Sequence, residues 1–386
     1  MGETYYLEKT KQIYGALKES VLTQAQRRTG EFISQVVDPA KVHPDFRLHV
    51  GDLCYRLSHY KRLLDIEDSI LKNQPYEIRS KLEKEILSTY GDKICEELNT
   101  HAKAIEPLCK SLSALEHSQY KTYFQERLLD LVTFQSEAAE RAYNKPNGYA
   151  GDYKLMEAFA SENIYQGKTL YEKCIYRWSV TWPSAAPVKS RLQVIHRELK
   201  ESVESTLQKK DRIRMLDLAC GPAIPVQWMM QEEISDKMEC FFLDQDAEAI
   251  GNLQSRLRDL KEQHGRKTQF HYYNQSIQKL LSDPKMIEEL KGQDFIVSSG
   301  LFDYLDDNLA QMLVQVLYSL LNPGGTLLIG NLSSDEPTTA FQWYIVEWPL
   351  YFRTQEEVLA LAPEGVKANI IAEELGYNLF LKIISK

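Results

Sequence analysis

The stretch MLDLACGPA, residues 215–223, decides the fold of this 386-residue chain. Residues 213–218 are mostly apolar and predict a buried strand, with Asp217 near its end. Ala219 and Gly221 follow in a turn that has no bulky side chain. In open α/β sheets the ligand crevice lies at the carboxyl ends of the strands, beside the first such turn. The stretch therefore predicts a small-molecule site on the backbone of this turn.

Three interpretations of the turn are open at this point. A dinucleotide-binding turn would more often read G-x-G-x-x-G, and Gly221 is the only one of those glycines present. An ordinary tight strand-to-helix turn is the plainest alternative. The spacing acidic-x-small-x-Gly-x-small, from Asp217 to Ala223, resembles the first motif of class I S-adenosylmethionine (SAM) methyltransferases. That resemblance implies SAM as the cofactor.

Polar side chains also end the next two predicted strands. Residues 240–244 are apolar up to Asp244, roughly 25 residues on, where a βαβ unit places the acid that accepts the ribose hydroxyls. Gln245 follows Asp244. Residues 270–273 form the third run. The groups after it can read an adenine edge, and they are Asn274, Gln275 and Ser276.

A fourth apolar run, residues 295–300, ends in two further candidates for cofactor contact, Ser299 and Gly300. The elements predicted after it are a helix over 309–321, a turn at 322–325, a strand over 326–330 and an antiparallel pair over 370–371 and 379–384. This alternation predicts an α/β fold with a doubly wound, Rossmann-like sheet of seven strands. The PGG turn before the fifth strand also resembles class I methyltransferases.

Composition narrows the function further. The net charge is −9, with a pI of about 5.5, so the chain lacks the basic surplus expected of a nucleic-acid-binding protein. The six cysteines show neither C-x-x-C pairing nor clustering with histidine, so we expect no metal site. Residues 1–15 lack the apolar core of a signal peptide, and no stretch is long enough to cross a membrane. We therefore expect a soluble, cytoplasmic protein.

The length suits two domains. Residues 1–140 show helical periodicity and predict a helical cap or dimerisation domain, so a homodimer is one alternative. Within them Ser136 is placed to cap a helix that ends at Asn144. Residues 141–186 are expected to form a connecting segment of helix and loop. Residues 187–386 are expected to form the SAM-binding domain, in which a helix over 188–207 precedes the first strand.

Three further stretches carry a more specific resemblance. They are KPNGYAGDY at 145–153, GLFDYLDD at 300–307 and WYIVEWPLYFR at 343–353. Together they resemble the bacterial 3-hydroxypalmitic acid methyl ester synthase family. The resemblance covers roughly residues 140–386 and implies a class I methyltransferase fold, SAM as methyl donor and an acyl or small carboxylic acid as methyl acceptor.

Site residues follow from these stretches and from the helix before the first strand. Asp303 and Tyr304 are candidates to orient the acceptor or to act as acid and base, or they simply cap and pack. Arg191 is a candidate partner of the cofactor carboxylate, or a surface arginine. The remaining candidates are Tyr149 for catalysis, Arg353 as a substrate carboxylate clamp, and Asp152, Trp343, Trp348 and Tyr351 for substrate binding.

The residues also bear on the acceptor. A carboxylate is ionised near neutral pH and needs no general base, whereas an alcohol, a phenol or an amine often does. The eight histidines do not cluster with the motifs. This favours a carboxylate acceptor. The alternatives are O- or N-methylation of a natural-product intermediate, and a binding protein that holds SAM without turnover.

Overall fold

The computed structural model describes residues 38–386. Seven strands form one sheet in the order β3-β2-β1-β4-β5-β7-β6. Strands β1 to β5 are parallel, and β7 runs antiparallel to both β5 and β6. The strands are β1 (Ile213–Leu218), β2 (Met238–Asp244), β3 (Gln269–Asn274), β4 (Gln293–Ser298), β5 (Leu321–Leu332), β6 (Ala368–Ala372) and β7 (Asn378–Ile384). This is the sheet of a Rossmann-like class I methyltransferase fold, and it confirms the predicted fold class.

The structure corrects one prediction about the sheet. Residues 322–325, predicted as a turn before the fifth strand, lie inside β5. The pairing of β4 with β5 shifts register between Gln293 and Phe295, which accommodates the extra residues. The Gly324 N–H donates to the Ser385 carbonyl at 3.0 Å, so this segment keeps strand-like bonding on its other edge.

Both faces of the sheet are covered by helices. Met215 and Phe242 pack on one face with helices α8 (Ala186–Leu207), α9 (Ile224–Met229) and α10 (Ala247–His264). Leu216 and Phe241 pack on the other face. The helices there are α11 (Ile277–Ser282), α12 (Pro284–Leu290), α13 (Asp307–Ser319) and α15 (Gln355–Leu359). Strands buried on both faces read as near-continuous apolar runs, which is why the sequence revealed them.

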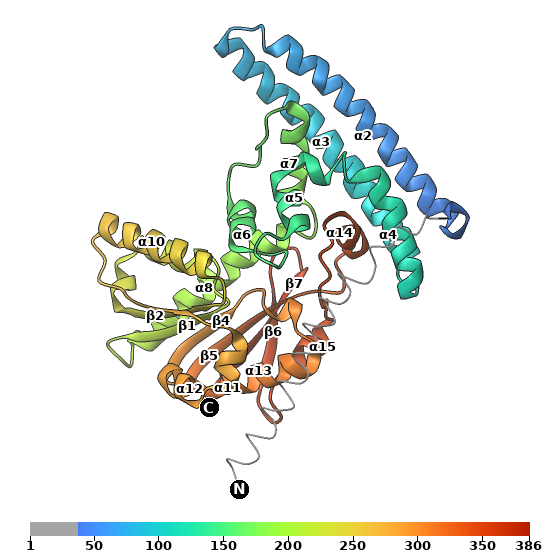
Figure 1. Ribbon diagram of the computed structural model, residues 1–386. Helices are drawn as coiled ribbons and strands as arrows, with labels where there is room; N and C mark the ends of the chain where they lie inside the picture. The colour runs from blue at the N-terminus through green and yellow to red at the C-terminus, as the bar shows by residue number, and fades with distance from the viewer. Residues whose placement is uncertain (1–37) are drawn as a thin grey trace.

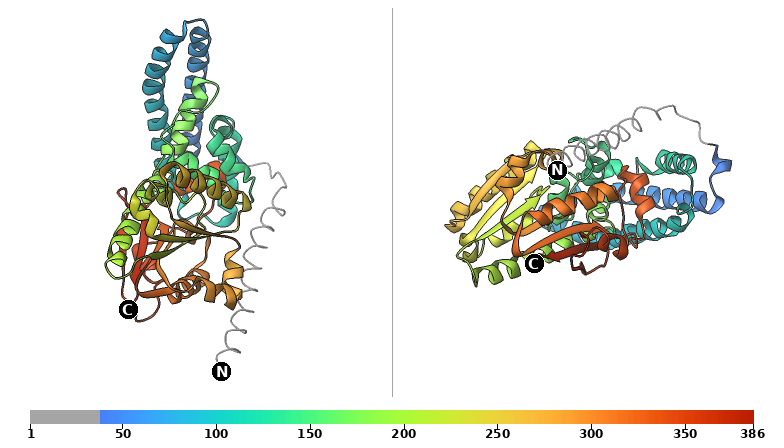
Figure 2. Two further views of the ribbon diagram at one scale, coloured as in Figure 1. Left: turned by 90° about the vertical axis from the view of Figure 1, so that its left-hand side faces the viewer. Right: turned by 90° about the horizontal axis from the view of Figure 1, so that it is seen from below.

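Six further helices build a helical part of the molecule, which lies above the sheet in Figure 1. They are α2 (Pro44–Leu71), α3 (Tyr76–Cys109), α4 (Ala114–Leu128), α5 (Glu137–Asn144), α6 (Tyr153–Ala160) and α7 (Leu170–Thr181). Figures 1 and 2 show α2 and α3 as a long hairpin that projects away from the sheet. Ser136 caps α5 as predicted, since its side chain accepts from the Ala139 N–H. Residues 38–386 also contain four short 3₁₀ helices, Pro39–Lys41, Thr133–Gln135, Glu233–Lys237 and Phe302–Tyr304.

The core of this helical part is not confined to the N-terminal sequence. It extends from Val42 to Val188, past the expected boundary at residue 140. It also takes in α14 (Thr339–Val346), which follows β5 in the sequence, and Phe341 and Tyr344 of that helix are fully buried in it. The helical part and the sheet are therefore joined by a segment of the C-terminal half. The part of the predicted cap at residues 1–37 lies outside the described residues.

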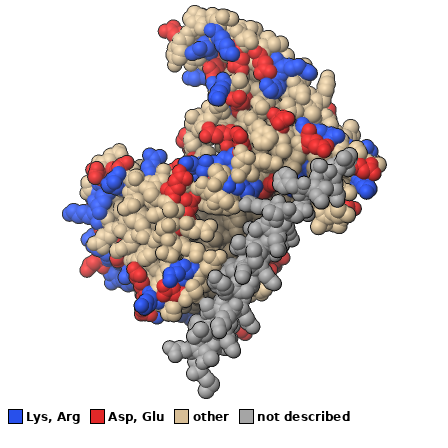
Figure 3. Space-filling view, in the orientation of Figure 1, with Lys and Arg blue, Asp and Glu red and all other residues tan. Residues whose placement is uncertain are grey.

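Two features of the described surface bear on membranes and nucleic acid. Across residues 38–386 no helix is both long and apolar enough to cross a bilayer. On the face shown in Figure 3, acidic and basic side chains lie interspersed, and the described residues form no continuous basic surface there. Such a surface is the usual electrostatic footprint of nucleic-acid binding.

Candidate functional site

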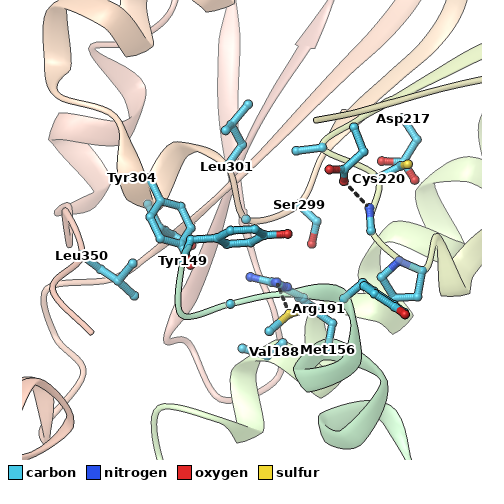
Figure 4. Close-up of a pocket in the computed structure, with 18 of the residues that line it drawn as sticks. Tyr149, Met156, Val188, Arg191, Asp217, Cys220, Ser299, Leu301, Tyr304 and Leu350 are labelled. Carbon is cyan, nitrogen blue, oxygen red and sulfur yellow. Dashed lines mark hydrogen bonds between the residues drawn. The ribbon is translucent and has the colours of Figure 1, made fainter. Parts of the chain in front are cut away.

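A cavity of about 560 Å³ opens at the carboxyl ends of β1, β2 and β4, beneath α6 and α8. The chain adds β2 and β3 on one side of β1 and then β4 and β5 on the other, so the strand order reverses between β1 and β4. Ligands of open α/β sheets bind at such a point. Figure 4 shows Asp217 and Cys220 at one end of the cavity and Tyr304 and Leu350 at the other, with the remaining labelled residues between them.

Asp244, at the end of β2, holds the turn that follows β1. Its Oδ2 accepts a hydrogen bond from the Gly221 N–H at 2.9 Å, and its Oδ1 accepts one from the Asp246 N–H at 2.9 Å. The Ala219 N–H donates to the Leu243 carbonyl at 2.7 Å, and this second hydrogen bond also holds the turn against β2. A carboxylate oxygen can accept more than one hydrogen bond, so Asp244 can also accept from a ligand.

The turn itself has an unusual backbone. Ala219, Gly221 and Ala223 have φ angles of +53°, +48° and +44°. The left-handed region costs an L-residue about 1–2 kcal/mol and suits glycine. A Cβ at Gly221 would have space, because its nearest neighbour is the Cβ of Tyr153 at 4.0 Å. Glycine is thus needed here for backbone conformation, and the empty volume is left for a ligand.

Two buried carboxyl groups dominate the electrostatics of this end. Burial raises the pKa of Asp217 well above its ordinary value, and the charge of Asp244 raises it further. Burial also raises the pKa of Asp244, although the N–H groups of Asp246 and Gly221 oppose that rise. This end of the cavity is consequently suited to a ligand that offers hydroxyl donors or positive charge.

The other end of the cavity is built around the Tyr304 hydroxyl. Its oxygen accepts from the Trp348 Nε1–H at 3.0 Å. Burial raises the pKa of Tyr304, so the hydroxyl stays protonated. Because the oxygen already accepts from Trp348, the hydroxyl proton is free to be offered to a ligand.

The loop at 145–152 joins the two ends. Asn147 Nδ2 donates to Asp246 Oδ2 at 2.7 Å, and the Tyr149 hydroxyl donates to the same oxygen at 3.4 Å. At its far end a Cβ on Gly151 would lie 2.5 Å from the Tyr304 hydroxyl oxygen. The loop is therefore anchored beside Asp244 and pressed against Tyr304, and it forms one wall of the cavity.

Asp303 lies in the cavity wall beneath Tyr304. Its Oδ1 accepts from the Leu332 N–H at 2.7 Å. Burial raises the pKa of Asp303 to about 6, whereas the charges of Arg191 and Arg353 and the Leu332 N–H oppose the rise. It is a buried carboxyl group that titrates near neutral pH.

The structure brings most of the predicted site residues to this one cavity. The predicted cofactor residues that line it are Arg191, Asp217, Ala219, Gly221, Asp244, Gln245, Gln275, Ser299 and Gly300. From the catalytic and substrate predictions, Tyr149, Asp303, Tyr304 and Trp348 line it too. Their roles toward a ligand stay predictions.

Two predicted cofactor residues point elsewhere. Asn274 Nδ2 donates to the carbonyls of Asp244 at 3.1 Å and Gln245 at 3.0 Å, so it braces the end of β2. Ser276 caps α11 by accepting from the Lys279 N–H at 3.2 Å. Neither lines the cavity. Both polar groups serve the local backbone, which a polar residue after a strand commonly does.

The structure also corrects the prediction that Arg353 clamps a substrate carboxylate. Its guanidinium is buried and donates to the carbonyls of Phe302 at 2.9 Å and Leu305 at 2.6 Å, to Asn331 Oδ1 at 2.5 Å and to Asp307 Oδ1 at 3.0 Å. It does not line the cavity. Its donors are used to hold the segment between β4 and α13, so none remains for a substrate carboxylate.

Three predicted substrate residues are corrected in the same way. Asp152 caps α6 by accepting from the Leu155 N–H at 3.1 Å, and it pairs with Arg141 at 2.7 Å. Trp343 packs against His117 in the helical core, with ring centroids 4.7 Å apart. Tyr351 is 48% exposed. None of these three side chains lines the cavity.

Sequence reasoning missed several cavity residues, namely Gly151, Met156, Gln278, Gln342 and Leu350. Gln342 had a signal, because it is the one amide in the apolar and aromatic run AFQWYIV at 340–346. Gly151 had a weaker one as the second glycine of the 145–153 stretch. The described residues contain no group of three or more His, Cys, Asp and Glu side chains that could hold a metal ion.

No protein-family model and no curated protein matches the chain. A solved structure of a possible exported protein from Bordetella parapertussis is 14% identical, covers 76% of this chain and 96% of that one, and gives a TM-score of 0.48. The magnesium protoporphyrin IX methyltransferase ChlM from Synechocystis PCC 6803, with bound S-adenosylhomocysteine (SAH), is 12% identical to this chain. The match covers 52% of this chain and 85% of that one, with a TM-score of 0.39. The N-methyltransferase NodS from Bradyrhizobium japonicum WM9, also with SAH, is 14% identical over 60% of this chain and 97% of that one, with a TM-score of 0.36. Similarities this distant carry no functional argument, and the fold assignment rests on the order and direction of the strands.

Proposed function

We propose that this chain is a SAM-dependent methyltransferase. The supporting observation is that a single cavity joins the Asp244–Gly221 turn to the Tyr304–Trp348 pair across the end of β4. A nucleoside-bearing donor and a separate acceptor can then meet above the sheet. The helical part, α6 above all, caps the meeting point.

The residues at the first end fit SAM. Asp244 can accept from both ribose hydroxyls, and Gln275 and Gln278 offer amides toward the base. The buried carboxyl groups of Asp217 and Asp244 favour a ligand that carries positive charge. When bound, SAM supplies a methyl group on a positively charged sulfur. The chain's own task is then to exclude water and to align the acceptor atom with that methyl group, which accounts for much of the rate effect in such displacements.

We further propose that the acceptor atom is a carboxylate oxygen. A carboxylate is already ionised near neutral pH and requires no base. The Tyr304 hydroxyl, which stays protonated and already accepts from Trp348, suits this role because it can donate to an oxyanion but cannot take up a proton. Tyr149 also has a pKa raised by burial, so it too stays protonated.

A hydroxyl or amine acceptor is the second candidate, and Asp303 favours it. A buried carboxyl group with a pKa near 6 on the cavity wall can act as a general base. The two candidates differ in their product, because a methyl ester releases methanol in mild base and an ether or N-methyl group does not. They differ also in the expected effect of Asp303→Asn. The substitution should abolish transfer to a hydroxyl or amine, which depends on a base, and should leave transfer to a carboxylate largely intact.

Calorimetric titration with S-adenosylhomocysteine (SAH) tests the proposed cofactor. Asp244→Ala removes the hydroxyl acceptor, and Gly221→Val forces a branched side chain into a left-handed turn. Each should weaken SAH binding about tenfold or more, which is about 1.4 kcal/mol. The matched control is Asp259→Ala, an exposed aspartate of α10. Unchanged affinity in both cavity variants would refute the assignment, and SAH binding without transfer to any acceptor would favour a non-catalytic binding protein.

A further inference from the structure

The wall of the cavity contains buried polar atoms that no group of residues 38–386 satisfies. Three of them, Arg191 Nε, Ser299 Oγ and Gln342 Oε1, belong to side chains that line it. Leaving a buried polar group unpaired costs free energy, and an unpaired charge costs more than a neutral group. Arg191 is therefore the feature of the cavity that calls most strongly for a ligand.

Arg191 lies on α8 and is 94% buried, since its relative exposure is 6%. Its contacts inside the protein are weak. Nη1 lies 3.4 Å from Asn378 Oδ1, Nη2 lies 3.7 Å from Met156 Sδ, and Nε has no partner. No carboxylate of the described residues lies within 4.0 Å of its guanidinium. An arginine normally offers five N–H donors in a planar fork, and an oxyanion is the ligand that this fork fits.

The position of Arg191 favours a role at the end of the cavity that is built around Tyr304, which we call the acceptor end. The guanidinium lies over Gly300, where a Cβ would be only 2.9 Å from Nη2, and it interacts electrostatically with Asp303 and Tyr304. Those residues follow β4, whereas Asp244 follows β2. Two strand spacings separate β2 from β4, which is about 10 Å.

We propose that Arg191, together with Ser299 and Tyr304, binds an anionic group of the methyl acceptor, so that this enzyme selects acids over neutral and cationic acceptors. The inference rests on the proposed function only in calling the ligand a methyl acceptor. The evidence that an anion binds here is the unsatisfied guanidinium of Arg191. It replaces Arg353 as the residue that holds the acid. It also assigns Arg191 to the acceptor, whereas the sequence placed it with the cofactor.

One other anion could occupy the same place, namely the carboxylate of the cofactor's own methionyl group. Binding of two nucleosides distinguishes an anion of the acceptor from the carboxylate of the cofactor. SAH carries that carboxylate, and methylthioadenosine lacks it while keeping the adenine and the ribose. If Arg191 serves the acceptor, Arg191→Met should leave the affinity for both nucleosides within about twofold of the wild type. A loss confined to SAH would give Arg191 to the cofactor and overturn the proposal.

Selectivity for the acceptor is tested with three probes of the same chain length, which are octanoate, octanol and octylamine. An eight-carbon chain suits the cavity because Met156, Phe159 and Val188 contribute apolar lining. Binding is measured with and without SAH. The wild type should bind octanoate roughly tenfold or more tightly than octanol, and Arg191→Met should remove that preference. Arg191→Lys should restore part of it, because an ammonium keeps the charge without the fork.

The control is Arg197→Met, since Arg197 lies on the same helix with 54% of its side chain exposed. Retained methylthioadenosine binding shows that Arg191→Met is folded. If the wild type binds octanol as tightly as octanoate, the inference about Arg191 is wrong even though SAH binds. If the wild type binds no SAH but still prefers octanoate through Arg191, the proposed methyl donor fails and the anion site stands.

Discussion

The indole Nε1 of Trp348 lies 3.0 Å from the hydroxyl oxygen of Tyr304 and donates a hydrogen bond to it. Trp348 follows α14, and Tyr304 follows β4, so this bond connects the helical part to the sheet. It also orients the tyrosine, because the oxygen that accepts from Trp348 must direct its own proton elsewhere. The Tyr304 end of the cavity thus depends on two segments that are 44 residues apart.

Gly151→Ala should damage the acceptor end and spare the cofactor end. The new Cβ would lie 2.5 Å from the Tyr304 oxygen and 2.7 Å from Trp348 Cζ2, so one of the two rings must move. We expect methyl transfer to fall about tenfold or more, since a displacement of about 1 Å in an active site can cost a hundredfold. SAH affinity should stay near that of the wild type. Gly251→Ala in α10, where the added Cβ meets nothing within 4 Å, is the control. Normal transfer by Gly151→Ala would show that the ring pair tolerates displacement.

Asp303→Asn should change how stability depends on pH. The folded protein raises the pKa of Asp303 from 3.8 to about 6, so the folded state holds this proton more tightly than the unfolded state. Stability is therefore lost as pH rises through this window, and it is regained as pH falls. Relative to the wild type, the variant should gain about 2 kcal/mol between pH 4.5 and pH 7.5. Urea unfolding at the two pH values measures this. A constant difference would mean that Asp303 has an ordinary pKa.

Arg353→Leu should act on stability. Four acceptors lose their donor, among them the buried carbonyls of Phe302 and Leu305. Breaking such a buried set should cost about 3 kcal/mol or more, measured as a lower urea midpoint. Arg258→Leu, at an exposed site of α10, should cost little. A stable Arg353→Leu protein that loses only acceptor binding would reinstate the clamp predicted from the sequence.

Removal of residues 1–185 should prevent folding of the remainder. Phe341 and Tyr344 of α14 are fully buried against helices that would be missing. Exposing two aromatic side chains costs roughly 2–3 kcal/mol each, and it also leaves an apolar surface that promotes aggregation. Solubility and cooperative thermal unfolding of the truncated chain test this. If the chain starting at Ala186 unfolds cooperatively and binds SAH normally, the helical part is an accessory domain.

The inner strands β1, β2 and β4 were predictable because strands that are buried on both faces are mostly apolar in sequence. The acids and small residues at the strand ends were predictable for a related reason. Parallel strands bring their carboxyl ends together, so Asp217, Asp244 and Ser299 could be expected to meet. What the sequence could not show is how each polar group is used once the chain folds.

Arg353 illustrates this second point. An arginine in an aromatic segment is equally compatible with a substrate clamp and with a structural brace. The outcome depends on where the carbonyls of Phe302 and Leu305 lie, and those positions are set by the chain about 50 residues earlier. Asn274 was misassigned for the same reason, since the carbonyl at the end of β2 attracts its amide. Arg191, by contrast, is identified by the absence of good partners among the residues that the structure describes.

The path of the chain through α14 has a consequence for how this protein can evolve. That helix leaves the sheet after β5, is buried among α3, α4 and α5, and returns with Trp348 at the cavity. A substitution in the interior of the helical part can therefore shift the wall that contacts the acceptor without altering any residue in the cavity. Acceptor preference can drift through mutations far from the ligand, while the cofactor turn, held by β1 and β2, remains constant. Under the proposed function, two proteins of this architecture can share every residue of that turn and still act on different acceptors.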